Sequence, residues 1–376
     1  MQISILNPIQ QTTFFTIILI VALLVSIRKK EGTAIFPISL TNELKGFAIL
    51  AIVLSHIGYF LSTDTNFLFP LSIMAGVGVD LFLFLSGYGL MVSALRNPLT
   101  VWEFLKKRLP RLYIPIWITL GVFFILDFFL LHKTYTGQTI AKSFAGFFQS
   151  ADIFNDVNSP LWFITLLLMY YILFPIVFSK RIPIVSSIIL FLSGYFLIKI
   201  NPSIFKDVMR LYSWHYIAFP LGVFVADISN REYKAFVVVR NWAMSVIQKR
   251  NVILSELSRY VCIAGLATIV GYFSLHNQSD KGDWIGQWVS VAVSSAILLI
   301  AILKPVEFKL FTLIGIYSFE VYLLHWPMMY RYDFLYRYMP AYIATALYVV
   351  LFVGIGYGFS LMINKLLISK KKVQAK

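Results

Sequence analysis

The sequence is poor in charged residues and in cysteine. Only 13% of its 376 residues are charged, whereas 59% are hydrophobic and 17% are aromatic. Because so few charges cannot cover a water-exposed surface, the composition excludes a soluble globular domain and predicts a polytopic membrane protein. Cys262 is the single cysteine, so an internal disulfide is excluded, and it lies in an apolar run.

Acidic residues are the scarcer of the two signs of charge. The chain has 17 Asp and Glu against 32 Lys and Arg, a net charge of +15. A basic excess can indicate nucleic acid, but here it falls in short runs between apolar segments, as in the positive-inside pattern. We therefore expect membrane lipids and no nucleic acid as partners. The basic tail, residues 369–376, is expected to lie at anionic headgroups on the cytoplasmic side.

Long apolar stretches predict an all-α membrane helical bundle of about 11 transmembrane helices, since roughly 20 residues span a bilayer. The stretches lie near 9–27, 44–62, 73–95, 112–131, 159–178, 183–199, 213–227, 260–275, 284–303, 310–330 and 341–364. The first has no Lys or Arg in residues 1–20 and is followed by RKK at 28–30, which favours an uncleaved span over a secretory signal.

The distribution of basic residues predicts the orientation. With eleven spans and the amino end outside, 24 of the 32 Lys and Arg residues fall on the cytoplasmic face and 8 on the outer face. The bias supports an outer amino terminus and a cytoplasmic carboxyl terminus. We expect a multi-pass protein of the cell membrane, by its Ile, Phe and Lys content a bacterial plasma membrane.

Four ionisable residues lie inside predicted spans, where burial is costly and function is the default hypothesis. They are His56, Asp80, Glu320 and His325. Counted along the helices, His56, Asp80 and His325 fall at similar depths in the outer half of the bilayer. Structural roles remain open: a histidine can bond a carbonyl, and Asp80, flanked by glycines, can join tightly packed helices.

Five motifs occur in order over residues 40–330: LKGFAILAIVLSHI, GVGVDLFLFLSGYGL, FLKKRLPRLYIPIW, SPLWFITLLLMYYILFP and IGIYSFEVYLLHWPMM. Their order resembles the acyltransferase-3 family of integral-membrane O-acyltransferases. The family usually has Arg where this chain has Lys45, and the span at 9–27 precedes its ten-helix core. The resemblance divides the chain into an extra helix with a basic loop (1–38), a membrane acyltransferase domain (39–368) and the basic tail.

The resemblance implies transfer of an acyl group, commonly acetyl, from cytosolic acyl-CoA to a hydroxyl of a cell-envelope glycan or lipid-linked sugar. Acyl-CoA is then the donor substrate, and we expect neither a permanently bound cofactor nor a metal. A hydroxyl that attacks a thioester needs a base of near-neutral pKa, which is a property of histidine. We assign His56 as this base and Asp80 as the carboxylate that orients it.

The anionic donor needs cations at the inner face. We assign Lys45, Lys107, Arg108 and Arg111 to donor binding, although positive-inside topology alone would also explain the cluster at 106–111. Eleven residues separate Lys45 from His56, about 16 Å along a helix, which an extended pantetheine arm can reach. Substrate binding is further assigned to the following residues: Trp162, Ser86, Glu320 and His325.

Two other classes of function remain open from the sequence. Buried Asp, Glu and His residues also relay protons in secondary transporters, and a glycan exporter would be another case. Against transport, the sequence shows no pair of similarly interrupted spans in corresponding positions of two halves. A non-catalytic partner of an envelope synthase is the third possibility.

Overall fold

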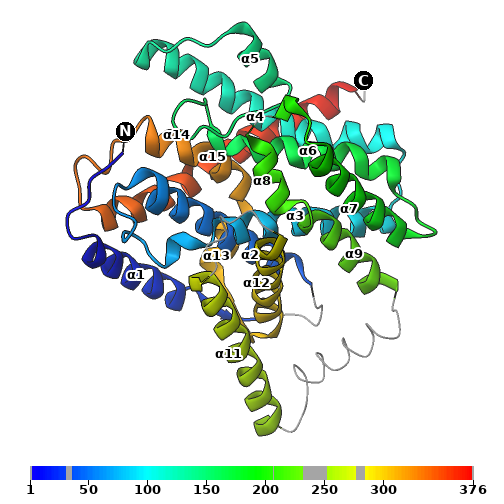
Figure 1. Cartoon of the computed structure of the whole chain (residues 1–376), viewed down its shortest axis with the longest axis horizontal. Helices are drawn as coiled ribbons and strands as arrows, with labels where there is room; N and C mark the ends of the chain where they lie inside the picture. The colour runs from blue at the N-terminus through cyan, green and yellow to red at the C-terminus, as the bar shows by residue number, and fades with distance from the viewer. Residues whose placement is uncertain (1, 31–35, 206, 232–251, 277–283, 375–376) are drawn as a thin grey trace.

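The computed structural model describes residues 2–30, 36–205, 207–231, 252–276 and 284–374 (Figure 1). These residues form a bundle of α-helices with one small sheet, in which β1 (Ile27–Lys29) pairs antiparallel with β2 (Val306–Phe308). The predicted all-α membrane bundle is confirmed.

Within the described residues, nine helices are long and apolar enough to cross a membrane. They correspond to α1 (Pro8–Val25), α2 (Ile38–Ser55) with its π-helical extension His56–Leu61, α3 (Ala75–Arg96), α4 (Val101–Leu131), α6 (Trp162–Val177), α7 (Pro183–Ile200), α11 (Val252–His276), α12 (Trp284–Leu303) and α15 (Ala341–Gln374). A shorter helix, α5 (Gly137–Phe144), lies in the loop that follows α4.

The two remaining predicted spans are each broken into a pair of helices. The stretch 213–227 falls on α8 (Val208–His215) and α9 (Ala218–Arg231), and 310–330 falls on α13 (Lys309–Ile316) and α14 (Ser318–Tyr330). Pro220 lies in the first turn of α9, where a missing N–H costs nothing. Tyr317, with φ −106° and ψ 16°, leaves the helical conformation between α13 and α14. Hydropathy is continuous across both breaks and therefore did not reveal them.

Glycines set the closest helix crossings. A Cβ atom on Gly46 of α2 would lie 1.8 Å from the backbone of α13, and one on Gly315 of α13 would lie 1.7 Å from the backbone of α2. Gly87 and Gly222 join α3 to α9 in the same reciprocal way, with 2.3 and 2.1 Å. Any side chain would separate these backbones, so the crossings depend on glycine. The first crossing fixes the helix turn that carries Lys45.

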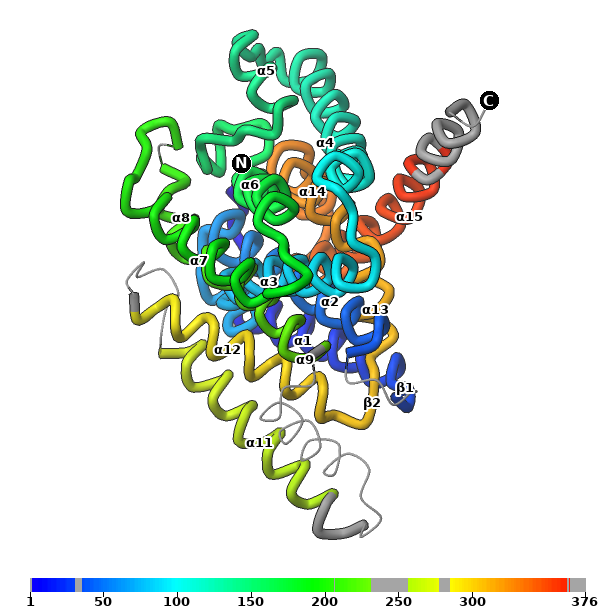
Figure 2. Tube along the Cα trace, turned by 90° about the vertical axis from the view of Figure 1, so that its right-hand side faces the viewer, coloured from blue at the N-terminus to red at the C-terminus, as the bar shows by residue number. Residues whose placement is uncertain are grey.

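A polar network attaches α1 to one end of the bundle. Glu307 of β2 accepts from the Arg28 guanidinium (3.0 Å) and from the Ser39 hydroxyl (2.7 Å). Glu43 of α2 accepts from the Phe308 amide at 2.8 Å and from the Lys304 ammonium. Figure 2 shows the small sheet at the edge of the bundle beside α13. The extra amino-terminal helix is thus tied to the end of α2 that carries Lys45.

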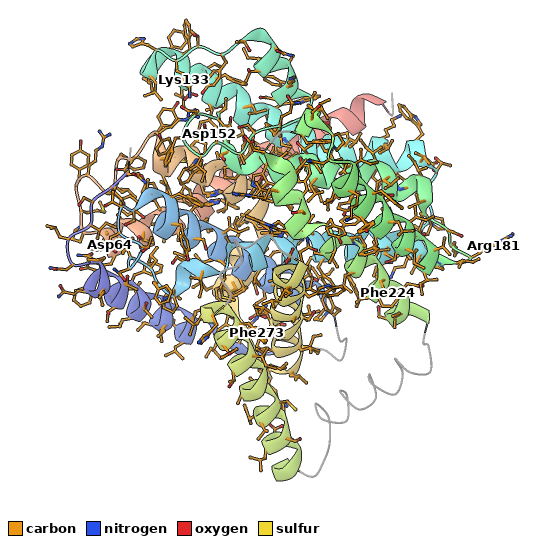
Figure 3. All side chains as sticks on the ribbon, in the orientation of Figure 1. Asp64, Lys133, Asp152, Arg181, Phe224 and Phe273 are labelled. Carbon is orange, nitrogen blue, oxygen red and sulfur yellow. The ribbon has the colours of Figure 1, made fainter. Side chains whose placement is uncertain are left out.

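The amino terminus lies at the opposite end of α2. The Ile3 amide donates to the Leu61 carbonyl at 2.8 Å, where the π-helical extension of α2 ends. Figure 3 shows Asp64, in the loop that follows, far across the bundle from Arg181, between α6 and α7. The two ends of the bundle are therefore distinct, and each functional side chain can be assigned to one of them or to the interior.

Candidate active site

A cavity of about 1270 Å³ lies inside the bundle and is lined from both of its ends. Lys45, Arg108 and Arg111 line it toward one end, and His56 lines it in the interior. Asp152, labelled in Figure 3, lines it from the loop between α5 and α6, toward the other end. One internal space thus connects the cationic residues, the histidine and a second, polar mouth.

His56 makes its polar contact with another histidine. Its Nδ1 lies 2.8 Å from Nε2 of His325, and the two rings are parallel, with centroids 5.0 Å apart. On the far side, Nδ1 of His325 lies 2.8 Å from the carbonyl oxygen of Tyr322. A carbonyl only accepts, so His325 Nδ1 carries a proton and neutral His325 accepts at Nε2. His56 then donates through Nδ1, which leaves a lone pair on its own Nε2.

The backbone changes form where His56 stands. The α-helix ends at Ser55, and a π-helix runs over His56–Leu61. Single π-helical turns are rare and are found frequently at functional sites. Trp326 lies against His56, with ring centroids 5.5 Å apart, and its Nε1 donates to the Ile153 carbonyl at 2.8 Å. The loop between α5 and α6 is thereby held beside the histidine.

Asp80 does not contact His56, and the predicted orienting role is corrected. Its Oδ1 lies 2.7 Å from Nδ1 of His215 on α8, and its Oδ2 accepts from the Ser290 hydroxyl of α12. Asp80 and His56 do not lie at the same depth, because the ends of their helices are not level. Gly78 of α3, two residues before Asp80, packs against Ala48 of α2. Ala48 lies eight residues before His56, about 12 Å along α2.

His215 is the partner that sequence reasoning missed. It is 5% exposed, lines the cavity and stacks on Trp162, with ring centroids 5.7 Å apart and planes inclined by 22°. The one available signal was a histidine inside the stretch 213–227, which is an expensive position for a polar ring. Together Asp80, His215 and Ser290 form a second buried polar cluster, which we call the α3–α8–α12 cluster.

The predicted donor-binding cations separate into two groups. Lys45, Arg108 and Arg111 line the cavity, and the Arg108 guanidinium donates to Ser93 Oγ at 3.3 Å. Among the described residues, Lys45 has no hydrogen bond or ion pair, so its ammonium is available to a ligand. Lys107 is exposed and is not part of the cavity wall, because it lies on another face of α4.

The predicted substrate-binding residues also separate. Trp162 and Ser86 line the cavity. Glu320 does not: its Cβ lies 3.4 Å from where Gly356 of α15 would carry a Cβ, so its side chain begins against that helix. His325 is fully buried behind His56 and reaches the cavity only through it. Equal spacing along α14 concealed this difference, since neighbouring helices decide which face meets the cavity.

The second mouth of the cavity is polar and aromatic. Asn201, Asp207, Arg210 and Trp214 line it, and the Arg210 guanidinium lies 5.2 Å from the Trp214 ring centroid. A hydrogen bond from the Asn155 side chain holds the pKa of Asp152 below its ordinary value, which makes this carboxyl an anion at neutral pH. None of these residues lies in the five sequence motifs.

Taken with the nine candidate spans among the described residues, this interior defines a polytopic helical membrane protein whose cavity contains groups suited to proton transfer. The acyltransferase-3 family model, described as an acyltransferase domain, matches residues 42–365. The chain belongs to this family and is a membrane acyltransferase. The match begins after α1 and includes both histidine clusters. No curated protein and no solved structure matches the chain.

Proposed function

We propose that the protein transfers an acyl group, acetyl in the simplest case, from acyl-CoA to a hydroxyl of a cell-envelope glycan or lipid-linked sugar. The observation that carries this proposal is the single cavity that joins Lys45, His56 and the polar mouth at Asp152. Two substrates can enter such a cavity from opposite ends and meet at the histidine.

The donor enters from the cationic end. Lys45, Arg108 and Arg111 hold the phosphates of acyl-CoA, because ammonium and guanidinium groups form strong charge-assisted hydrogen bonds with phosphate oxygens. The pantetheine arm extends along α2, about 16 Å from the level of Lys45 to that of His56. Acyl-CoA is a substrate in this scheme, and the reaction uses no permanently bound cofactor.

The acceptor enters from the polar mouth. Its hydroxyls exchange hydrogen bonds with Asn201, Asp207 and the Asp152 carboxylate, while Trp214 offers an aromatic face to the apolar face of a sugar ring. Trp162 and Ser86 contact the substrates deeper in the cavity. This arrangement suits an acceptor too large or too polar to enter from the cationic end.

His56 Nε2 is the general base. As the acceptor oxygen bonds to the thioester carbon, its proton moves to Nε2, and the carbonyl electrons move to oxygen. The resulting imidazolium keeps its Nδ1–H bond to His325, which in turn is held by the Tyr322 carbonyl. When the carbonyl re-forms, the C–S bond breaks, and the thiolate takes the proton from Nε2. Every proton is thus returned, and the products are an ester and free CoA.

The proposed setting is the plasma membrane of a bacterium, with the amino terminus outside and the carboxyl terminus in the cytoplasm. The basic-residue bias supports this orientation, because it places the cationic end of the cavity where acyl-CoA is made. Single cysteines, introduced into a Cys262→Ser background and labelled from each side of the membrane, test this orientation. Labelling at position 64 from the cytoplasmic side would reverse the assignment.

The deciding experiment uses purified protein in nanodiscs, radiolabelled acetyl-CoA and a panel of envelope glycans and lipid-linked sugars. We expect transfer by the wild-type protein and a loss of at least about 100-fold with His56→Ala. His276→Ala is the matched control, since His276 is exposed and outside the cavity wall. Full transfer by His56→Ala would contradict the proposal and would favour a transporter or a non-catalytic partner.

A further inference from the structure

Ser55 immediately precedes His56 and has an unusual hydroxyl. The residue is 2% exposed and lines the same cavity as His56. Its Oγ has no hydrogen-bond partner among the described residues. Buried side-chain hydroxyls are almost always bonded, so an unbonded one beside a candidate base calls for a functional explanation.

Other hydroxyls on the helices of this bundle show the usual alternative. Thr12, Ser193 and Thr345 each donate to the carbonyl four residues earlier, at 2.8, 2.7 and 2.8 Å. Ser55 has an intact α-helix before it and could form the same bond. Its hydroxyl instead stays unbonded at the boundary between the α-helix and the π-helix that begins with His56.

Neighbouring donors around His56 are already engaged. Trp326 Nε1 donates to the Ile153 carbonyl, and the Tyr322 hydroxyl donates to the Pro160 carbonyl. The Nδ1–H of His56 is bonded to His325. Ser55 therefore differs from these neighbours in keeping a donor that a bound substrate could use.

We propose that the Ser55 hydroxyl donates a hydrogen bond to the thioester carbonyl oxygen as that oxygen becomes an oxyanion. This inference rests on the proposed acyl transfer and adds a catalytic residue to it. Addition of the acceptor hydroxyl to the carbonyl carbon places a negative charge on oxygen while His56 takes the proton. A fixed donor aimed at that oxygen stabilises the developing charge more than it stabilises the neutral carbonyl. When the oxyanion collapses, the C–S bond breaks, the thiolate takes the proton from His56 Nε2, and the re-formed carbonyl no longer carries the charge that Ser55 stabilised.

The first test is steady-state kinetics with Ser55→Ala. We expect kcat to fall by about 100-fold or more, with little change in the KM for acetyl-CoA, because the lost bond exists in the transition state. Ser193→Ala is the matched control: it also removes a helical serine hydroxyl, but one bonded within its own helix. Thermal unfolding should show Ser55→Ala at least as stable as wild type, since an unbonded buried hydroxyl costs stability.

The second test replaces the thioester carbonyl oxygen, which is the atom proposed to accept the hydrogen bond from Ser55. In the dithioester analogue of acetyl-CoA, the carbonyl oxygen is sulfur, a weak hydrogen-bond acceptor. We expect the analogue to slow wild-type protein strongly and Ser55→Ala much less, so that the two losses are not additive. Ser55→Cys keeps a weak donor, so the analogue should slow it less than wild type and more than Ser55→Ala.

The outcomes separate this inference from the proposed function. Equal slowing of wild type and Ser55→Ala by the sulfur analogue would overturn the oxyanion role, as would a Ser55→Ala variant with wild-type kcat. In both cases acetyl transfer by wild type would stand. Absence of transfer by wild type from acetyl-CoA to every acceptor tested would instead overturn the proposed function, and this inference with it.

Discussion

His56 and His325 are hydrogen-bonded to each other across 269 residues of sequence, with Nδ1 and Nε2 2.8 Å apart. In the proposed reaction, this pairing makes His325 the positioning residue of His56. It gives His56 a neutral partner in the place that a carboxylate takes in many catalytic triads. His56 is therefore oriented without a fixed negative charge beside it.

Loss of His325 should impair catalysis more than binding. With His325→Ala, the Nδ1–H of His56 loses its acceptor, so its tautomer and ring orientation are no longer fixed. We expect kcat to fall by about 100-fold or more with little change in the KM for acetyl-CoA. His325→Gln should recover part of the rate, because its amide oxygen can accept the bond. Equal activity of the alanine and glutamine variants would contradict the positioning role.

Lys45 should act on the donor. We expect Lys45→Gln to raise the KM for acetyl-CoA more than the KM for the acceptor, and Lys45→Arg to retain function, because both residues keep the charge. Lys107→Gln is the matched control, since Lys107 is exposed and lies outside the cavity wall. Kinetics with each substrate varied in turn would decide it. Equal KM values for the Lys45 and Lys107 glutamine variants would limit Lys45 to a topological role.

Asp80 should be important for stability as well as for activity. Removing one partner typically costs about 3 to 5 kcal/mol for a buried ion pair and about 1 to 3 kcal/mol for a buried hydrogen bond, because the other partner stays buried and unpaired. Asp80→Ala leaves His215 and Ser290 in that condition, so its unfolding temperature in detergent should fall clearly. His56→Ala should leave that temperature nearly unchanged. An Asp80→Ala protein with full stability but no activity would indicate instead that Asp80 takes part in the reaction.

The α2–α13 crossing should not tolerate a methyl group. Gly315→Ala places a Cβ atom 1.7 Å from the backbone of α2, and backbone cannot move aside as a flexible side chain can. We expect a large loss of folded protein by size-exclusion chromatography. Gly354→Ala is the control, because no atom lies within 4 Å of its Cβ position. Similar yields of the two variants would show that the helices can separate without loss of the fold.

Much of the fold could be predicted from the sequence, because apolar length is a direct consequence of membrane thickness. The family resemblance was likewise carried by short motifs and is confirmed by the match over residues 42–365. The breaks at Tyr317 and before Ala218 could not be predicted, since both keep the chain apolar while only the backbone changes direction.

The candidate site was predicted in its residue types and only partly in its contacts. Histidines and Asp80 stand out because burial of polar groups in a membrane is costly. Which of them meet depends on the depth and rotation of separate helices, and one-dimensional spacing does not contain either quantity. Asp80 contacts His215, which lies outside the five sequence motifs, and His56 contacts His325.

The tie between Arg28 and Glu307 has a consequence for assembly. Its two residues are 279 positions apart, and at ordinary translation speeds of about 5 to 20 residues per second, Glu307 emerges about 14 to 56 s after Arg28. Before then, α1 can contact only parts of the chain that have already been made, such as the Leu61 carbonyl that accepts from the Ile3 amide. The ion pair that ties the carboxyl end of α1 to the small sheet therefore forms late in synthesis, after most helices of the bundle have been made.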